Sequence, residues 1–231
     1  MLKLLIEPYC ELCGRELAYS ELETGICENC INEIKFLSLG NSCVKCSLPE
    51  VGEDCPYCRD LSFVFERNFS LFDYKGSIKN IFFEIKFNQS KEKTKVFHRL
   101  LEKLDIEEII GMKIDLIVPV PSSPLVYFKR GFNLVNEIFK PISSKWGIEF
   151  LEVLGRRFFY KSQKKLSKSE RAKEIAKQFF VRKKVDLSDK VALIVDDVFT
   201  TGNTINTCAT LLRSLGVLKV YSLTLFRANL I

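Results

Sequence analysis

Eight cysteines within the first 58 residues constrain the fold of this chain more than any other feature. They form four Cys-x-x-Cys pairs, separated by 13, 12 and 8 residues: Cys10/Cys13, Cys27/Cys30, Cys43/Cys46 and Cys55/Cys58. A two-residue spacer lets a tight turn aim two sulfur atoms at one ion, and two pairs complete a tetrahedral site. Four pairs therefore predict two zinc sites. Sequential pairing (the first pair with the second, the third with the fourth) is the economical solution, and the spacing leaves an interleaved pairing open.

Zinc held by four thiolates is structural, because no coordination position stays open for a substrate. We expect residues 1–60 to form a small double zinc-ribbon-like module whose folding depends on metal. Disulfides are the weaker interpretation. The apolar start of the chain is stopped by Glu7 and Pro8 before it can form a signal peptide, which indicates a reducing, cytoplasmic location. No apolar run approaches the roughly 18 residues that span a bilayer.

Charge divides the chain near the same boundary. Residues 1–60 carry 11 acidic and 5 basic residues, whereas residues 61–231 carry 18 acidic and 30 basic ones. Within the second part, residues 156–184 hold 12 Lys or Arg against only two Glu. Such a block either contacts an anion or is a solvated surface. Because Arg156 and Arg157 run into Phe158, Phe159 and Tyr160, single-stranded nucleic acid is one possible anion.

Residues 61–231 alternate apolar strand patterns with helical periodicity, which predicts an α/β domain. Strands are expected at 63–65, 69–74, 113–119, 191–195 and 220–226, and helices around 78–85, 96–104, 133–143, 170–177 and 204–215. Alternating strands and helices favour a parallel sheet with helices on both faces. The single histidine, His98, and the ninth cysteine, Cys208, are interpreted as structural residues.

The segment Val191–Thr204 is the strongest candidate for chemistry. An apolar strand, Val191–Val195, leads into Asp196 and Asp197, and a polar loop follows directly before a helix: Thr200, Thr201, Gly202, Asn203 and Thr204. A helix N-terminus presents free N–H groups to a phosphate, and a glycine lets the backbone approach it closely. The two carboxylates suit the vicinal hydroxyls of a sugar, with Mg²⁺ as an oxygen-ligated helper. The alternative is a buried strand followed by an ordinary capped helix.

This segment resembles the phosphoribosyl-pyrophosphate (PRPP) signature of type I phosphoribosyltransferases. Further matches make the chain similar to the ComF family of competence-associated proteins, which carry four cysteine pairs ahead of such a domain. These matches are Tyr74–Ile81, Lys86–Phe87, Val118–Pro121, Lys129–Asn133, and Gln163 and Leu166 with Arg171. The resemblance implies a type I phosphoribosyltransferase-like domain over residues 61–231.

By this resemblance, Asp196 and Asp197 hold the ribose hydroxyls, and residues Thr200 to Thr204 hold the 5′-phosphate with Mg²⁺ nearby. The basic block lies where the family places a mobile loop, which makes Lys164, Lys165 and Arg171 candidate catalytic ligands of pyrophosphate, with Lys129 and Arg130 as further cations. The chain departs from the family at Ser123, where a His is usual, and at Glu174, where an Asn is usual. These departures concern the pyrophosphate side and favour PRPP binding over efficient transfer.

Three functions are compatible with the sequence. In the first, by family resemblance, a PRPP-binding competence protein handles single-stranded DNA during natural transformation. In the second, an active phosphoribosyltransferase transfers a pentosyl group to a nucleobase or amine. In the third, a PRPP-sensing adaptor recruits a partner, such as the family's helicase-like component, through its zinc module.

Overall fold

The computed structural model describes residues 9–34, 41–51, 55–102, 107–158 and 174–228. Its helices are α1 (Glu28–Glu33), α2 (Gly76–Phe87), α3 (Thr94–Glu102), α4 (Glu107–Ile110), α5 (Pro124–Arg130), α6 (Leu134–Trp146) and α8 (Asn203–Arg213), with short 3-10 turns at Tyr19–Glu21 and Lys91–Lys93. Its strands are β1 (Asn68–Asp73), β2 (Leu116–Pro119), β3 (Glu149–Phe150), β4 (Leu154–Arg156), β5 (Phe179–Val181), β6 (Val191–Phe199) and β7 (Lys219–Arg227).

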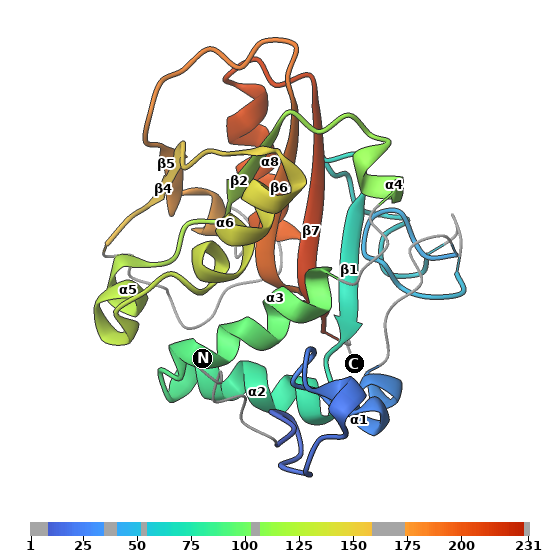
Figure 1. The fold of residues 1–231 in the computed structure, drawn as a ribbon. Coiled ribbons are helices and arrows are strands. Elements are labelled where there is room, and N and C mark those ends of the chain that lie inside the picture. The colour runs from blue at the N-terminus through green and yellow to red at the C-terminus, as the bar shows by residue number, and fades with distance from the viewer. Residues whose placement is uncertain (1–8, 35–40, 52–54, 103–106, 159–173, 229–231) are drawn as a thin grey trace.

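Five strands form a parallel sheet in the order β1-β7-β6-β2-β3, and β4 pairs with β5 in a separate antiparallel hairpin (Figure 1). The central strand, β6, begins with the apolar run from Val191, and its residues from Ala192 to Val195 are buried. A strand that is apolar on both sides requires cover on both faces of the sheet.

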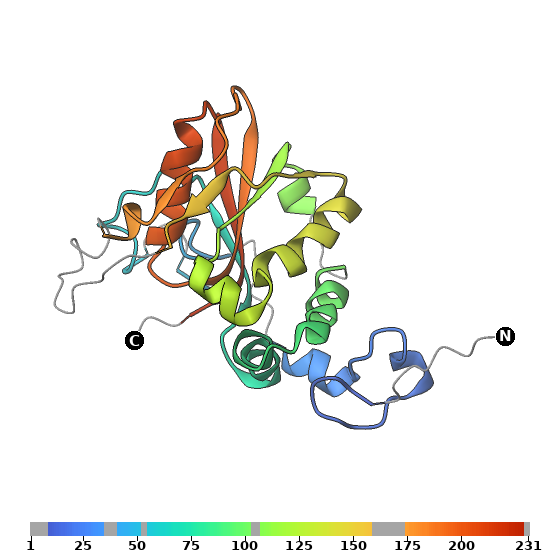
Figure 2. The same ribbon diagram turned by 90° about the vertical axis from the view of Figure 1, so that its left-hand side faces the viewer.

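Each face of the sheet has its own core, because successive side chains of a strand point to opposite sides. On one face, Leu193 and Val195 of β6 pack with α2, α3 and α6. On the other, Ala192 and Ile194 pack with α8 and with the β4–β5 hairpin. Figure 2 shows the helices on the two sides of the sheet. The predicted parallel α/β architecture is confirmed.

Most predicted elements are present with shifted ends. The predicted helices at 78–85, 96–104, 133–143 and 204–215 correspond to α2, α3, α6 and α8, and the strands at 69–74, 113–119, 191–195 and 220–226 to β1, β2, β6 and β7. The helix expected around 170–177 is described only from residue 174, and residues 174–176 are helical. Within the described part of the chain, no helix has the length and apolar character that crossing a bilayer requires.

The strand predicted at Phe63–Phe65 is wrong, since Phe63 has no regular secondary structure and Val64 and Phe65 lie in a bend. The alternation of apolar residues has another cause: the rings of Phe63 and Phe65 turn toward the end of β6, with centroids 4.9 Å apart. Between them, the Val64 N–H donates to the side-chain oxygen of Asn206 at 2.6 Å instead of to a strand partner.

Candidate functional site

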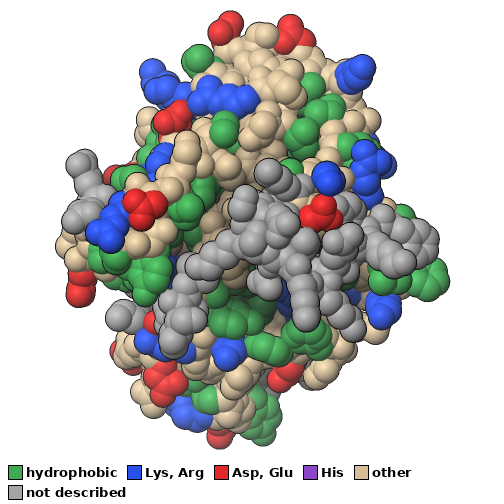
Figure 3. Space-filling model, turned by 180° about the vertical axis from the view of Figure 1, so that it is seen from behind, with side chains coloured by type: hydrophobic (Ala, Val, Ile, Leu, Met, Phe, Trp, Pro, Cys, Tyr) green, Lys and Arg blue, Asp and Glu red, His purple; other side chains and the backbone are tan. Residues whose placement is uncertain are grey.

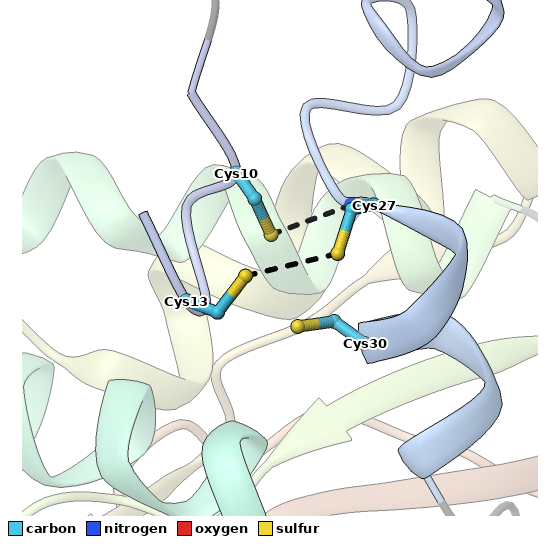
Figure 4. A group of neighbouring side chains, drawn as sticks. All are labelled: Cys10, Cys13, Cys27 and Cys30. Carbon is cyan, nitrogen blue, oxygen red and sulfur yellow. Dashed lines mark hydrogen bonds between the residues drawn. The ribbon is translucent and has the colours of Figure 1, made fainter. Parts of the chain in front are cut away.

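The first cysteine segment, residues 9–34, brings Cys10, Cys13, Cys27 and Cys30 together (Figure 4). Cys10 and Cys13 lie on a tight turn in which the Gly14 N–H donates to the Cys10 carbonyl at 2.8 Å. Cys27 caps α1 and Cys30 lies in its first turns, so the second pair comes from a helix start. The Cys13 and Cys27 sulfurs are 3.7 Å apart.

The second cysteine segment, residues 41–51 and 55–58, gathers Cys43, Cys46, Cys55 and Cys58. Its turn repeats that of the first, because the Ser47 N–H donates to the Cys43 carbonyl at 2.9 Å. All four cysteines are buried, whereas Cys13 of the first segment is exposed. The structure therefore groups the pairs sequentially, which is the more economical of the two pairings that the sequence leaves open.

Both clusters fit zinc. Four sulfurs placed 2.3 Å from one tetrahedral ion lie about 3.8 Å from each other. The Cys13–Cys27 and Cys46–Cys55 sulfur pairs are both 3.7 Å apart, and all four ligand atoms of each cluster lie within 4.8 Å of one another. Each donor set is complete without a further ligand, which is the arrangement of a structural metal site.

A separate cavity of about 460 Å³ opens at the carboxyl ends of β2 and β6. This is the edge at which parallel α/β sheets bind ligands. Its polar lining includes Asp196, Asp197, Thr200 and Thr204 from β6 and the residues after it. Three cations from elsewhere in the chain also line it: Lys86, Arg130 and Arg156.

The two carboxylates of the cavity differ in their surroundings. Asp197 pairs with Lys86, with Oδ2 2.8 Å from Nζ. Asp196 accepts the Asp197 N–H at 2.8 Å. Burial raises the pKa of Asp196 well above its usual range, and the adjacent Asp197 charge adds to this rise, which Lys86 and Arg156 oppose. Burial of charge at a cavity is a feature of ligand sites.

The strand extends further than predicted and delivers both carboxylates to the cavity from within β6. After Phe199 the chain turns at Gly202, which has φ +75° and precedes the first residue of α8. A Cβ at Gly202 would lie 2.9 Å from the rings of Phe199 and Phe63, so glycine is required by both space and backbone conformation. Thr200 and Thr204 line the cavity, whereas Thr201 and Asn203 do not. Thr200 and Thr201 are exposed, and Asn203 and Thr204 are half-buried at the helix start.

The predicted cations are only partly brought together. Arg130 lines the cavity and its Nε donates to the Lys86 carbonyl at 3.2 Å, whereas its neighbour Lys129 is exposed. Lys164, Lys165 and Arg171 lie outside the described residues. Burial lowers the pKa of Arg130, and Asp197 opposes this effect.

Three charged or aromatic residues of the lining were not among the predicted site residues: Tyr74, Lys86 and Arg156. Lys86 directly follows the buried Ile85 on α2. Helical periodicity places Lys86 at the edge of the apolar face of the helix and gives no sign that it reaches a ligand site. Arg156 is the last residue of β4, where it donates to Gln178 Oε1 at 2.8 Å and stacks 5.1 Å from the Phe179 ring. In the sequence it is the first cation of a long basic block, and nothing there separates it from its neighbours.

Comparisons with known proteins identify the domain that contains this cavity. A family model described as "Phosphoribosyl transferase domain" matches residues 87–229. Competence protein ComFC of Streptococcus pneumoniae is 29% identical over 94% of this chain and 99% of its own length. DNA utilization protein YhgH of Escherichia coli K12 is 27% identical over 94% of this chain and 96% of its own length. Competence protein F of Haemophilus influenzae is 25% identical over 89% of this chain and 92% of its own length.

Among solved structures, adenine phosphoribosyltransferase from Saccharomyces cerevisiae matches with a TM-score of 0.38 and 20% identity, over 57% of this chain and 68% of that one. The adenine phosphoribosyltransferase from Thermoanaerobacter pseudethanolicus matches with the same TM-score and 16% identity, over 61% of this chain and 83% of that one. Proteins named as competence proteins are similar to the chain along most of its length. The family assignment rests on the matched domain: the chain belongs to the phosphoribosyl transferase domain family.

Proposed function

We propose that the cavity binds PRPP. The observation that carries the proposal is the placement of opposite charges around one space: Asp196 and Asp197 at the end of β6, and Lys86, Arg130 and Arg156 around them. A phosphorylated sugar with a pyrophosphate group presents hydroxyls for carboxylates and anions for cations. A neutral or purely anionic ligand would leave one of these sets without a partner.

Each part of the ligand has a matching set of residues in this proposal. The 5′-phosphate lies against Thr200 to Thr204, where the first N–H groups of α8 are free to donate. The ribose hydroxyls lie at Asp196 and Asp197, whose oxygens also suit Mg²⁺. The pyrophosphate lies toward Arg130 and Arg156, with Lys164, Lys165 and Arg171 as predicted further ligands.

The same cations offer transfer chemistry, because leaving pyrophosphate needs its charge stabilised. Release of pyrophosphate in the presence of an acceptor base would identify an enzyme.

A second function, handling of single-stranded DNA, is favoured by exposed aromatic rings beside the cavity. Tyr74 lines the cavity, its ring lies 6.2 Å from that of Phe83, and Phe83 lies 5.2 Å from Phe87, which is 64% exposed. Lys79 lies 5.0 Å above the Tyr74 ring, and Phe128 on α5 is 85% exposed. Rings interleaved with cations are the usual platform for unpaired bases.

Figure 3 shows Lys and Arg side chains lying among exposed hydrophobic ones on one face of the molecule. The relatives named as competence and DNA utilization proteins support a role with DNA for this chain as well. We place this role in the cytoplasm, and we assign the PRPP site to a domain of residues 61–231, with residues 1–60 as the zinc module.

Calorimetric titration of PRPP with Mg²⁺ tests the first function. The parent protein is expected to bind, and the Asp196→Asn/Asp197→Asn variant is expected to lose binding. The matched control is Asp115→Asn, since Asp115 accepts from the Val191 N–H at the opposite end of β6. Equal affinity in parent and double variant, or no binding by the parent, would exclude the cavity as a PRPP site.

Single-stranded oligonucleotide binding tests the second function. Affinity is expected to fall steeply with salt and to weaken by about thirtyfold or more when Phe87 and Phe128 are both changed to alanine, because each stacked base contributes about 1–3 kcal/mol. Affinity that does not change in this variant would remove the aromatic surface from the proposal.

A further inference from the structure

The second cysteine segment is joined to the sheet by buried polar groups. Ser47 has a φ of 56°, uncommon for a residue other than glycine, and is 2% exposed. Its hydroxyl donates to the Asn68 carbonyl at 2.7 Å and accepts the Ser70 N–H at 3.0 Å. The Asn68 N–H donates to the Val44 carbonyl at 2.9 Å. Because unpaired buried polar groups are costly, these bonds fix the segment against β1.

The chain that leaves this segment runs against the loop of the cavity. Phe65 lies edge-on to Phe199, the last residue of β6, with centroids 6.5 Å apart. Phe63 stacks on Phe65 and lies so close to Gly202 that no Cβ would fit there. The rings of Phe63 and Phe199 therefore limit where the backbone of the 200–204 loop can lie.

Hydrogen bonds link the same parts along two routes. On one, the Val64 N–H donates to Asn206 Oδ1 at 2.6 Å, in the first turns of α8. On the other, Arg227 Nε donates to the Cys46 carbonyl at 3.0 Å, and the next residue, Ala228, donates its N–H to the carbonyl at the end of β6 at 2.9 Å. Ala228 also lines the cavity. Arg227, which bonds the Cys46 turn of the second segment, is thus adjacent in the chain to Ala228, which lines the candidate ligand site.

The first cysteine segment makes its contacts elsewhere. Arg99 of α3 pairs with Glu11 and donates to the Thr24 carbonyl at 3.1 Å. The buried cysteines of this segment share a core with α2 and α3, on the opposite face of the sheet from α8. In Figure 2 the segment, drawn in blue, lies beyond these two helices.

We propose that the second cysteine segment positions the 200–204 loop, with Phe63 as the residue that transmits its position. A metal held by Cys43, Cys46, Cys55 and Cys58 then supports ligand binding through this loop, whereas a metal in the first segment, which packs on α2 and α3, does not position the loop. The consequence for affinity rests on the proposed PRPP function. The coupling between segment and loop can be measured without a ligand.

The test compares three variants of the full chain: Phe63→Ala, the conservative Phe63→Leu, and Arg99→Ala as the matched control in the first segment. PRPP with Mg²⁺ is titrated by calorimetry, zinc content is measured with a chromogenic chelator, and hydrogen exchange is followed for the amides of residues 200–206. Phe63→Ala is expected to weaken PRPP binding by roughly tenfold, within the range of coupling through packed side chains. Its zinc content is expected to match that of the parent.

Faster exchange confined to residues 200–206 in Phe63→Ala, restored by Phe63→Leu and absent in Arg99→Ala, would support positioning of the loop. Affinity within about twofold of the parent, together with unchanged loop exchange, would overturn it, since coupling of this kind changes affinity measurably. If the parent itself does not bind PRPP, the proposed function fails, and loop exchange alone then decides the coupling.

Discussion

The two cysteine segments present the same donor set from the same kind of turn, but they pack against opposite faces of one sheet. The first touches α3 through Arg99, a half-exposed contact at the edge of the helical layer. The second inserts Ser47 into a buried polar network and passes directly to the residues that support the cavity loop. A metal-binding motif therefore indicates a local fold, while its role depends on what that fold contacts.

The largest expected difference between the segments is in the stability of the protein after one zinc-binding cysteine is replaced. Cys55→Ser should unfold the domain or lower its melting temperature by more than 10 °C, because structural zinc contributes on the order of 10 kcal/mol and the second segment is part of a core. Cys13→Ser, at the exposed ligand of the first cluster, should leave the sheet folded. Thermal unfolding followed by circular dichroism, with zinc content measured in parallel, distinguishes the two. Similar losses of melting temperature in both variants would show that the two segments do not differ in their contribution to stability.

The polar network predicts the next largest effect. Asn68 bonds Ser47, Ser70 and Ser222 through its side chain, so Asn68→Ala leaves several buried groups unpaired and should cost about 2–4 kcal/mol. The matched change in the first segment is Thr24→Ala, which removes a hydroxyl that donates to a local carbonyl and should cost about 1 kcal/mol. Urea unfolding gives both free energies. An equal cost would show that burial of the second segment adds nothing.

Asp196 lies at the cavity itself, and its stability effect depends on pH. Its folded-state pKa is raised, so its contribution to stability is present at low pH and is lost as pH rises through that pKa. Asp196→Asn should therefore stabilise the ligand-free protein by about 1–2 kcal/mol at neutral pH, while abolishing PRPP binding. The gain over the parent should shrink toward pH 4, where the unfolded state of the parent also begins to bind the proton. Melting curves from pH 4 to 9 measure it, and a gain that grows toward low pH would contradict the sign.

The sequence predicted the parts of the site that lie close together in the chain. Val191–Thr204 contains its strand, carboxylates, loop and helix start in one run, and each Cys-x-x-Cys pair is equally local, although the spacing left open which pairs share a metal. Arg156 and Lys86 could not be predicted as partners of Asp196 and Asp197, because they reach the cavity only through the packing of the β4–β5 hairpin and α2.

Helix α5 was missed for a different reason. It has Pro124 at its start and Gly131 at φ +81° after its end, which are good boundary signals. Its apolar residues from Leu125 to Phe128 are exposed, however, so no amphipathic period marks the helix.

His98, interpreted from the sequence as a structural residue, bonds the Glu137 carbonyl through Nε2 at 2.8 Å.

The smallest expected effect comes from Arg99→Ala, which removes the pair with Glu11 and the bond to the Thr24 carbonyl. Partly exposed ion pairs contribute about 1 kcal/mol or less, so the melting temperature should fall by only a few degrees. PRPP affinity and zinc content at the second cluster should not change, because the contact lies on the face of the sheet opposite α8. A clear loss of PRPP affinity in this variant would mean that the two faces communicate through the sheet. The division of roles between the two cysteine segments would then have to be abandoned, although their difference in burial would remain.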